Sequence, residues 1–135
     1  MSDERKVRFG WLRVMYVWTI LGAGGFGLMA LFAPSLMESL MGFPVQDPFL
    51  RGVLGSVYVA SGILSILGLR SPLKFVPVLF LQLCYKAIWF IVVLLPRLLG
   101  GQFPTHAMVL ALVFATYVIG DLIAIPFGRL FAREA

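Results

Sequence analysis

The sequence contains few charged residues for its length. Charged residues make up 13% of the 135 residues, and hydrophobic residues make up 61%. An average soluble domain carries about 25% charged residues. A soluble fold could not cover its core with so little polar surface, so the composition excludes that class. The length allows one domain but not two independent cores.

Cysteine and histidine each occur once, as Cys84 and His106. One cysteine cannot form an internal disulfide, and no spacing of metal ligands is present. Neither a Ser/His/Asp set nor a pair of carboxylates can be assembled. We therefore predict no metal site and find no catalytic signature.

Four long apolar runs make up most of the sequence. Each has about the 20 residues that a helix needs to cross the hydrocarbon core of a bilayer, and none alternates as a barrel strand does. Short connections favour antiparallel neighbours. The sequence predicts an all-α integral membrane four-helix bundle, a single transmembrane domain over residues 1–135, with helices at about 11–32, 52–69, 75–95 and 106–127.

The positions of glycine and proline are consistent with four membrane-spanning helices. The segment GAGGFG in the first run has no preceding strand, so we interpret it as a face for close helix packing rather than a nucleotide loop. We place Pro77 in the first turn of the third helix, where its missing N–H costs nothing, and Pro126 in the last turn of the fourth. The other prolines, Pro96 among them, are assigned to connections.

Basic residues are distributed unequally between the two sides of the predicted bundle. One side has only Arg51 and Arg97, whereas the side of the two termini has Arg5, Lys6, Arg8, Arg13, Arg70, Lys74, Arg129 and Arg133. The side rich in Lys and Arg is normally cytoplasmic. We therefore predict that both termini are cytoplasmic, and we attribute the net charge of +5 to membrane topology rather than to nucleic-acid binding.

The 33–50 segment is predicted to be the one long outer loop. Within it, PSLMESLMGF is typical of a short amphipathic helix on the membrane surface, and PVQDPF indicates a turn into the second helix. We expect the loop to cover the outer mouth of the bundle as a lid, because it has four large apolar side chains to bury: Leu40, Met41, Phe43 and Phe49.

Two ionisable residues lie deep inside the apolar runs, where charges are costly and normally have a partner. Lys86 lies about 18 Å and Asp121 about 10 Å from the cytoplasmic ends of their helices. Their side chains lean toward each other, because helical side chains tilt toward the helix N-terminus. We expect a direct or water-bridged pair.

Other polar residues share helical faces with this pair, and buried tyrosine hydroxyls need hydrogen-bond partners. The sequence predicts a polar cavity between the second, third and fourth helices. Its candidate ligand-binding residues are Arg51, Tyr58, Gln82, Tyr85, Lys86, Trp89, Tyr117 and Asp121. In the alternative interpretation the Lys–Asp pair locks helix packing, and the tyrosines bond to neighbouring backbone.

Several segments carry a family resemblance, namely APSLMESLMGFPVQDPF, LRGVLGSVYVASGIL, GLRSPLKFVPV, YKAIW and GDLIAIPF. Over about residues 10–130 the chain resembles the DoxX-like group of small four-helix bacterial membrane proteins. The resemblance implies a bacterial inner membrane. DoxX itself resembles a quinone-linked oxidoreductase subunit, and by analogy Arg51, Lys86 and Asp121 are the polar positions of interest.

We expect a non-catalytic integral membrane protein that binds a small apolar molecule, a quinone or a lipid, or that acts as an accessory membrane subunit. One alternative is a subunit of a membrane redox enzyme, which needs a cofactor-bearing partner. Another is a small proton-coupled transporter that uses Asp121 and Lys86 and works as a homo-oligomer. The lipid bilayer is a partner in every case, and nucleic acid in none.

Overall fold

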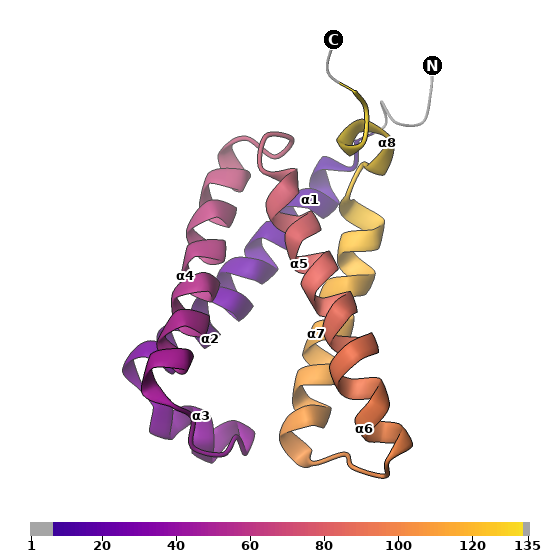
Figure 1. Cartoon of the computed structure of the whole chain (residues 1–135). Helices are drawn as coiled ribbons and strands as arrows, with labels where there is room; N and C mark the ends of the chain where they lie inside the picture. Colours follow the sequence, from indigo (N-terminus) through magenta and orange to yellow (C-terminus); the bar gives the residue numbers. More distant parts are fainter. Residues whose placement is uncertain (1–6, 134–135) are drawn as a thin grey trace.

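The computed structural model describes residues 7–133, and over this range it is an all-α protein. Its helices form four segments that are long and apolar enough to cross a membrane: Phe9–Phe32, Pro48–Arg70, Val76–Leu99 and Thr105–Ala124. The predicted four-helix membrane bundle is therefore confirmed (Figure 1).

Two of the spans are interrupted by π-helical turns, in which each N–H bonds to the carbonyl five residues earlier. The elements are α1 (Phe9–Thr19), η2 (Ile20–Gly24), α2 (Gly25–Phe32), α3 (Pro34–Met41), α4 (Pro48–Arg70), α5 (Val76–Ile88), η3 (Trp89–Leu94), α6 (Leu95–Leu99), α7 (Thr105–Ala124) and α8 (Phe127–Leu130). The first span comprises α1, η2 and α2, and the third comprises α5, η3 and α6.

The second span begins earlier than the sequence predicted, at Pro48. Asp47 caps it, because its carboxylate accepts a hydrogen bond of 2.9 Å from the backbone N–H of Leu50. Pro48 follows at the first helical position, where the φ angle fixed by its ring already has a helical value. At 23 residues this helix is longer than the predicted span of about 52–69.

The third span ends later than predicted, at Leu99, so Pro96 lies inside a helix and not in a connection. Proline lacks the N–H that would continue the α-helical ladder. The hydrogen bonds ahead of it follow the π pattern instead, since the N–H of Leu95 bonds to the carbonyl of Phe90. The π-helical turn thus lets the helix pass through Pro96.

The fourth span ends at Ala124, so Pro126 does not lie in its last turn. Ile125 is extended (φ −69°, ψ 125°), as expected for the residue before a proline.

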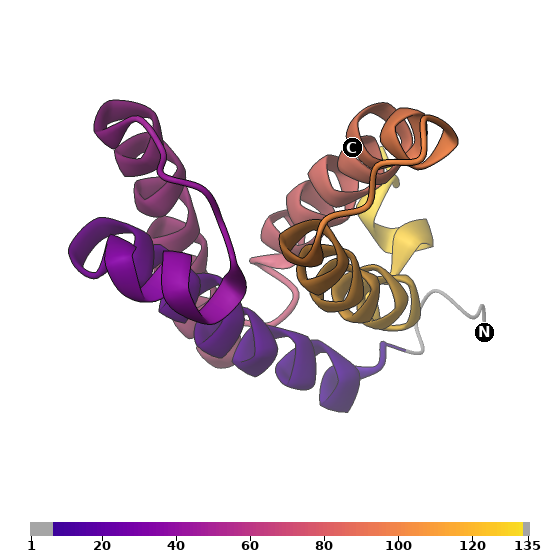
Figure 2. The same ribbon diagram turned by 90° about the horizontal axis from the view of Figure 1, so that it is seen from below.

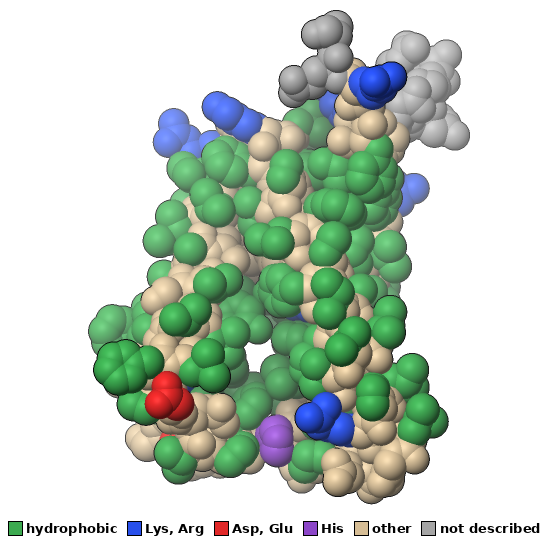
Figure 3. Space-filling model, viewed as in Figure 1, with side chains coloured by type: hydrophobic (Ala, Val, Ile, Leu, Met, Phe, Trp, Pro, Cys, Tyr) green, Lys and Arg blue, Asp and Glu red, His purple; other side chains and the backbone are tan. Residues whose placement is uncertain are grey.

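Of the basic residues predicted to be cytoplasmic, Arg5 and Lys6 lie outside the described residues. Basic side chains are visible at the end of the molecule where both termini lie (Figure 3).

The predicted surface helix in the 33–50 segment is present as α3, and it ends where Gly42 adopts φ +78°. The segment covers only part of the bundle end. Phe43 lies 6.0 Å from Phe26 and 5.2 Å from His106 between ring centroids. Leu40 and Phe49 are 70% and 86% exposed, so the expectation that they are buried was wrong.

The spans form two pairs, one of α1–α2 with α4 and one of α5–α6 with α7 (Figure 1). Glycines allow the first pair to pack closely, since a Cβ on Gly27 would lie 2.7 Å from the carbonyl oxygen of Gly55. The predicted packing role of the GAGGFG segment is therefore confirmed. Seen along the bundle, the pairs stand apart and α1 runs beneath both (Figure 2).

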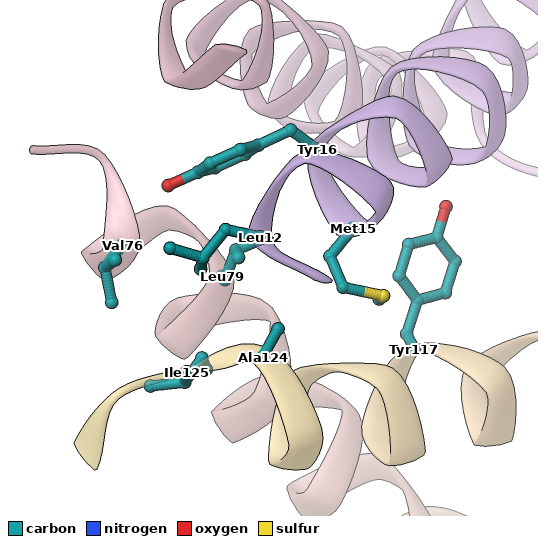
Figure 4. Close-up of a cluster of buried hydrophobic side chains, with 8 residues drawn as sticks. All are labelled: Leu12, Met15, Tyr16, Val76, Leu79, Tyr117, Ala124 and Ile125. Atoms are coloured by element: carbon teal, nitrogen blue, oxygen red, sulfur yellow. The ribbon is translucent and has the colours of Figure 1, made fainter. Parts of the chain in front are cut away.

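The two pairs meet near the termini. There a cluster of buried side chains joins α1, α5 and α7 (Figure 4), made of Leu12, Met15, Tyr16, Val76, Leu79, Tyr117, Ala124 and Ile125. The hydroxyl of Tyr16 donates to the carbonyl of Pro72 at 2.6 Å, which fixes the turn between α4 and α5. We call this part the closed half.

Away from the termini the pairs diverge, and a space-filling view shows an opening between them (Figure 3). This part contains η2, α2, α3, η3, α6, the last turn of α5 with Lys86, and the N-terminal halves of α4 and α7, and we call it the open half. The helix pairs thus enclose a space whose closed end is formed by the packed cluster.

Candidate functional site

The opening between the helix pairs contains a central cavity of about 260 Å³. All four spans and α3 contribute to it, and most of the walls are aromatic or aliphatic. The lining residues are Trp18, Gly22, Ala23, Phe26, Met29, Met41, Tyr58, Lys86, Leu110, Val113, Phe114 and Tyr117.

Lys86 is the one charged residue in this lining, and only 1% of its surface is exposed. Its Nζ donates to Gln82 Oε1 and to the hydroxyl of Tyr85, both at 3.1 Å. It also lies 4.1 Å from the ring centroid of Tyr117 and 5.2 Å from that of Phe114. Aromatic faces stabilise a desolvated cation, so α5 and α7 together hold the buried ammonium in place.

The Lys86 side chain is connected to α1 through Gln82. The amide Nε2 of Gln82 donates to Thr19 Oγ1 at 3.4 Å, and this hydroxyl donates in turn to the carbonyl of Met15 at 2.8 Å. Thr19 is fully buried. Sequence reasoning missed it, although a lone threonine in the middle of an apolar run is a signal that could have found it.

Asp121 is fully buried on α7. Neither of its carboxylate oxygens has a hydrogen-bond partner in the part of the chain that the structure describes. The direct form of the expected pair with Lys86 is therefore not present, and the water-bridged form stays a prediction. Lys86 instead bonds to an acceptor on its own helix, Gln82, one turn earlier.

The deep tyrosines find partners in two ways. The hydroxyl of Tyr117 donates to the carbonyl of Trp18 at 2.8 Å, which ties α7 to α1. The hydroxyl of Tyr85 accepts from Lys86, and its ring lies 6.2 Å from that of Tyr58 between centroids. Backbone bonding and a polar site are thus both present among these residues.

Two other candidate residues, Arg51 and Trp89, line cavities other than the central one. Arg51 donates to the carbonyls of Ala30 and Gln46 at 3.0 and 3.2 Å, and it lines a separate cavity of about 270 Å³ beside α3. Trp89 packs on Phe114 at 5.1 Å between centroids and lines a third cavity of about 670 Å³ near α6.

The structure therefore divides the eight candidates into groups. Tyr58, Lys86 and Tyr117 line the central cavity, and Gln82 and Tyr85 hold Lys86 in position. Among residues 7–133 no group of three His, Cys, Asp or Glu side chains is placed to hold a metal ion. The central cavity thus combines aromatic and aliphatic walls with one buried lysine side chain.

No protein-family model matches this chain, and no match is found among curated proteins or among solved structures.

Proposed function

We propose that this chain is a non-catalytic integral membrane protein whose central cavity binds a small apolar molecule with a hydrogen-bond acceptor, a quinone or a lipid. One observation carries the proposal. An ammonium group has three N–H donors, and Lys86 uses two of them on Gln82 and Tyr85 while lining an otherwise apolar cavity. The third donor supplies a fixed polar contact for a ligand.

The walls of the cavity support an apolar occupant. Ligand sites are typically lined by hydrophobic and aromatic side chains, with a few polar groups that orient the ligand. Phe26 and Phe114 form flat walls, while Met29 and Met41 add flexible, polarisable ones. Methionine adapts to ligands of different shape.

Binding rather than catalysis is proposed because Lys86 acts as a donor held by its neighbours and not as a free nucleophile. A quinone is favoured by the resemblance to the DoxX-like group, in which DoxX resembles a quinone-linked oxidoreductase subunit. The same binding site would suit an accessory subunit of a membrane redox enzyme, whose cofactors a partner subunit would carry.

The proposal is tested by mass spectrometry of molecules retained after purification in a mild detergent. We expect a quinone or lipid in a fixed ratio to the protein. Lys86→Met should lose it, whereas Lys74→Met, which changes an exposed lysine, should keep it. Equal retention by both variants, or no retained molecule in the unaltered protein, would contradict the proposal. A stoichiometric redox protein in the preparation would favour the accessory-subunit role.

A second candidate function is a proton-coupled transporter, and the buried carboxylate of Asp121 without a hydrogen-bond partner favours it. Such a group must neutralise or pair with a cation. Four helices make a narrow pathway, so this function would require a homo-oligomer. Flux into liposomes driven by a pH gradient, lost in Asp121→Asn, would support it over simple binding.

We further propose that the protein lies in a bacterial inner membrane, as the resemblance implies. Both termini would then lie in the cytoplasm, which the unequal distribution of Lys and Arg supports. Single cysteines in a Cys84→Ala background test the orientation. With an impermeant thiol reagent on intact cells, Ser39→Cys should react and Lys74→Cys should not. The reverse pattern would show the opposite orientation.

A further inference from the structure

Tyr58 lines two cavities at once. One is the central cavity that contains Lys86, and the other is a groove of about 420 Å³ lined by Leu50, Val53, Leu54, Val57, Tyr58 and Tyr85. We call the second the α4 groove. Tyr58 therefore stands between a space inside the bundle and a space on its flank.

The α4 groove opens toward the lipid. Val53 and Val57 on its floor are 62% and 47% exposed, and both belong to a span that crosses the membrane. The helices α4 and α5 meet at the turn near the termini and diverge from it (Figure 1). The opening between the helix pairs is visible from this side (Figure 3). The site is thus accessible sideways from the bilayer.

Tyr85 connects the groove to the buried cation. Its ring lines the α4 groove, and its hydroxyl accepts a hydrogen bond of 3.1 Å from Lys86. The ring of Tyr58 lies 6.2 Å from that of Tyr85 between centroids. These two side chains therefore form the boundary between the α4 groove and the central cavity.

We propose that the occupant is an amphiphile with one apolar chain, and that it enters sideways between α4 and α5. Its acceptor head reaches Lys86, its chain passes between Tyr58 and Tyr85, and the rest of the chain lies in the α4 groove. This inference rests on the proposed function, and it narrows the ligand to molecules with a quinone-like or carboxyl head on a long hydrocarbon chain.

The central cavity has a second possible exit, beside α3, and it is less suitable for a hydrocarbon chain. At the far end the cavity is bordered by Met41 of α3, beside Phe43, whose ring lies 5.2 Å from that of His106. A chain leaving there would enter the polar interfacial region of the membrane. A chain leaving sideways stays in hydrocarbon, where apolar surface is not exposed to water.

Photolabelling with two probes tests the route. One probe is a benzoquinone with a diazirine near the end of a ten-carbon chain, and the other is a fatty acid with a diazirine at the same position. Labelling that excess unlabelled probe abolishes is counted as specific. We expect specific adducts on Leu50, Val53, Leu54 or Val57, and a strong loss of them in Val57→Phe, which fills the groove. The matched control Val14→Phe, at a site 53% exposed on α1, should label as the unaltered protein does.

The outcomes separate the two proposals. Adducts from either probe in the α4 groove support the route, and the probe that labels identifies the head group as a neutral carbonyl or a carboxylate. Specific adducts confined to Met41, Phe43 or Leu110 would overturn sideways entry while leaving ligand binding intact. No specific labelling by either probe would overturn the inference, and if no molecule is retained on purification either, the proposed function fails with it.

Discussion

The closed and open halves of this bundle are built from similar apolar residues, yet they pack differently. In the closed half Leu12, Tyr16 and Leu79 have no exposed surface, and they belong to the cluster that joins α1, α5 and α7. In the open half the lining residues Phe26, Met29 and Tyr58 are only half-buried. The difference indicates that the closed half supplies stability, and that the open half is free to hold a ligand.

The largest difference in the free energy of unfolding is expected between alanine variants of two leucines in the third span. Leu79→Ala removes a fully buried side chain of the closed half and should lower the free energy of unfolding by about 2–5 kcal/mol. Leu81→Ala, two residues later and 55% exposed, is the control and should change it little. Chemical unfolding in detergent measures both. Equal costs would show that the closed half is not the source of stability.

The next largest effect concerns glycines of α4. A Cβ on Gly68 would lie 2.5 Å from Tyr16 Cε1, whereas one on Gly52 meets nothing within 4 Å. Because Tyr16 is fully buried, Gly68→Ala should destabilise by about 3 kcal/mol, the upper end for overpacking. Gly52→Ala should stabilise by about 0.4–1 kcal/mol. A neutral Gly68→Ala in the same unfolding assay would mean that the closed half is loosely packed.

Hydropathy was enough to predict the spans, and small residues were enough to predict that the first span packs closely against another helix. The predicted positions of Pro96, in a connection, and of Pro126, in the last turn of the fourth helix, were wrong for physical reasons. Pro96 is accommodated by a π-helical turn, which hydropathy does not reveal, and Pro126 is preceded by an extended residue that ends the helix earlier.

The candidate site was predicted only in part. Helical spacing placed Gln82 and Lys86 on one face, and the structure joins them by a hydrogen bond. The same spacing could not show which acceptor Lys86 would use, so the direct form of the expected pair with Asp121 was wrong, while the water-bridged form stays a prediction. The angle between the helix pairs depends on packing across several helices, and the open half was therefore beyond sequence reasoning.

Smaller effects are expected at the two buried charges. Lys86→Met leaves the acceptors on Gln82 and Tyr85 without their donor, and at about 1 kcal/mol per hydrogen bond it should cost about 2 kcal/mol. Asp121→Asn replaces a buried carboxyl group that makes no hydrogen bond, so it should be neutral or slightly stabilising. Unfolding of both single variants and of the double variant measures their coupling. Losses of equal size, with strong non-additivity, would instead show that the two charges act as a pair.

The smallest effect on stability is expected in the lining of the open half. Met29 is half-buried and already borders a cavity, so Met29→Ala should cost less than about 1 kcal/mol, below the range for a packed core residue. Retention of the bound molecule should nevertheless fall, because the cavity loses one of its walls. A cost typical of a packed core with unchanged retention would assign Met29 to stability alone.

The most direct test of the separation between the two halves is the thermal unfolding of three proteins with and without an added short-chain quinone or oleate. A ligand that binds only the folded state at about 100 times its Kd adds about 2.7 kcal/mol of stability. The unaltered protein and Leu79→Ala should both gain the full upward shift in Tm, although Leu79→Ala unfolds at a lower temperature. Lys86→Met should show no shift. A full shift in Lys86→Met, or its loss in Leu79→Ala, would contradict the assignment of binding to the open half and of stability to the closed half.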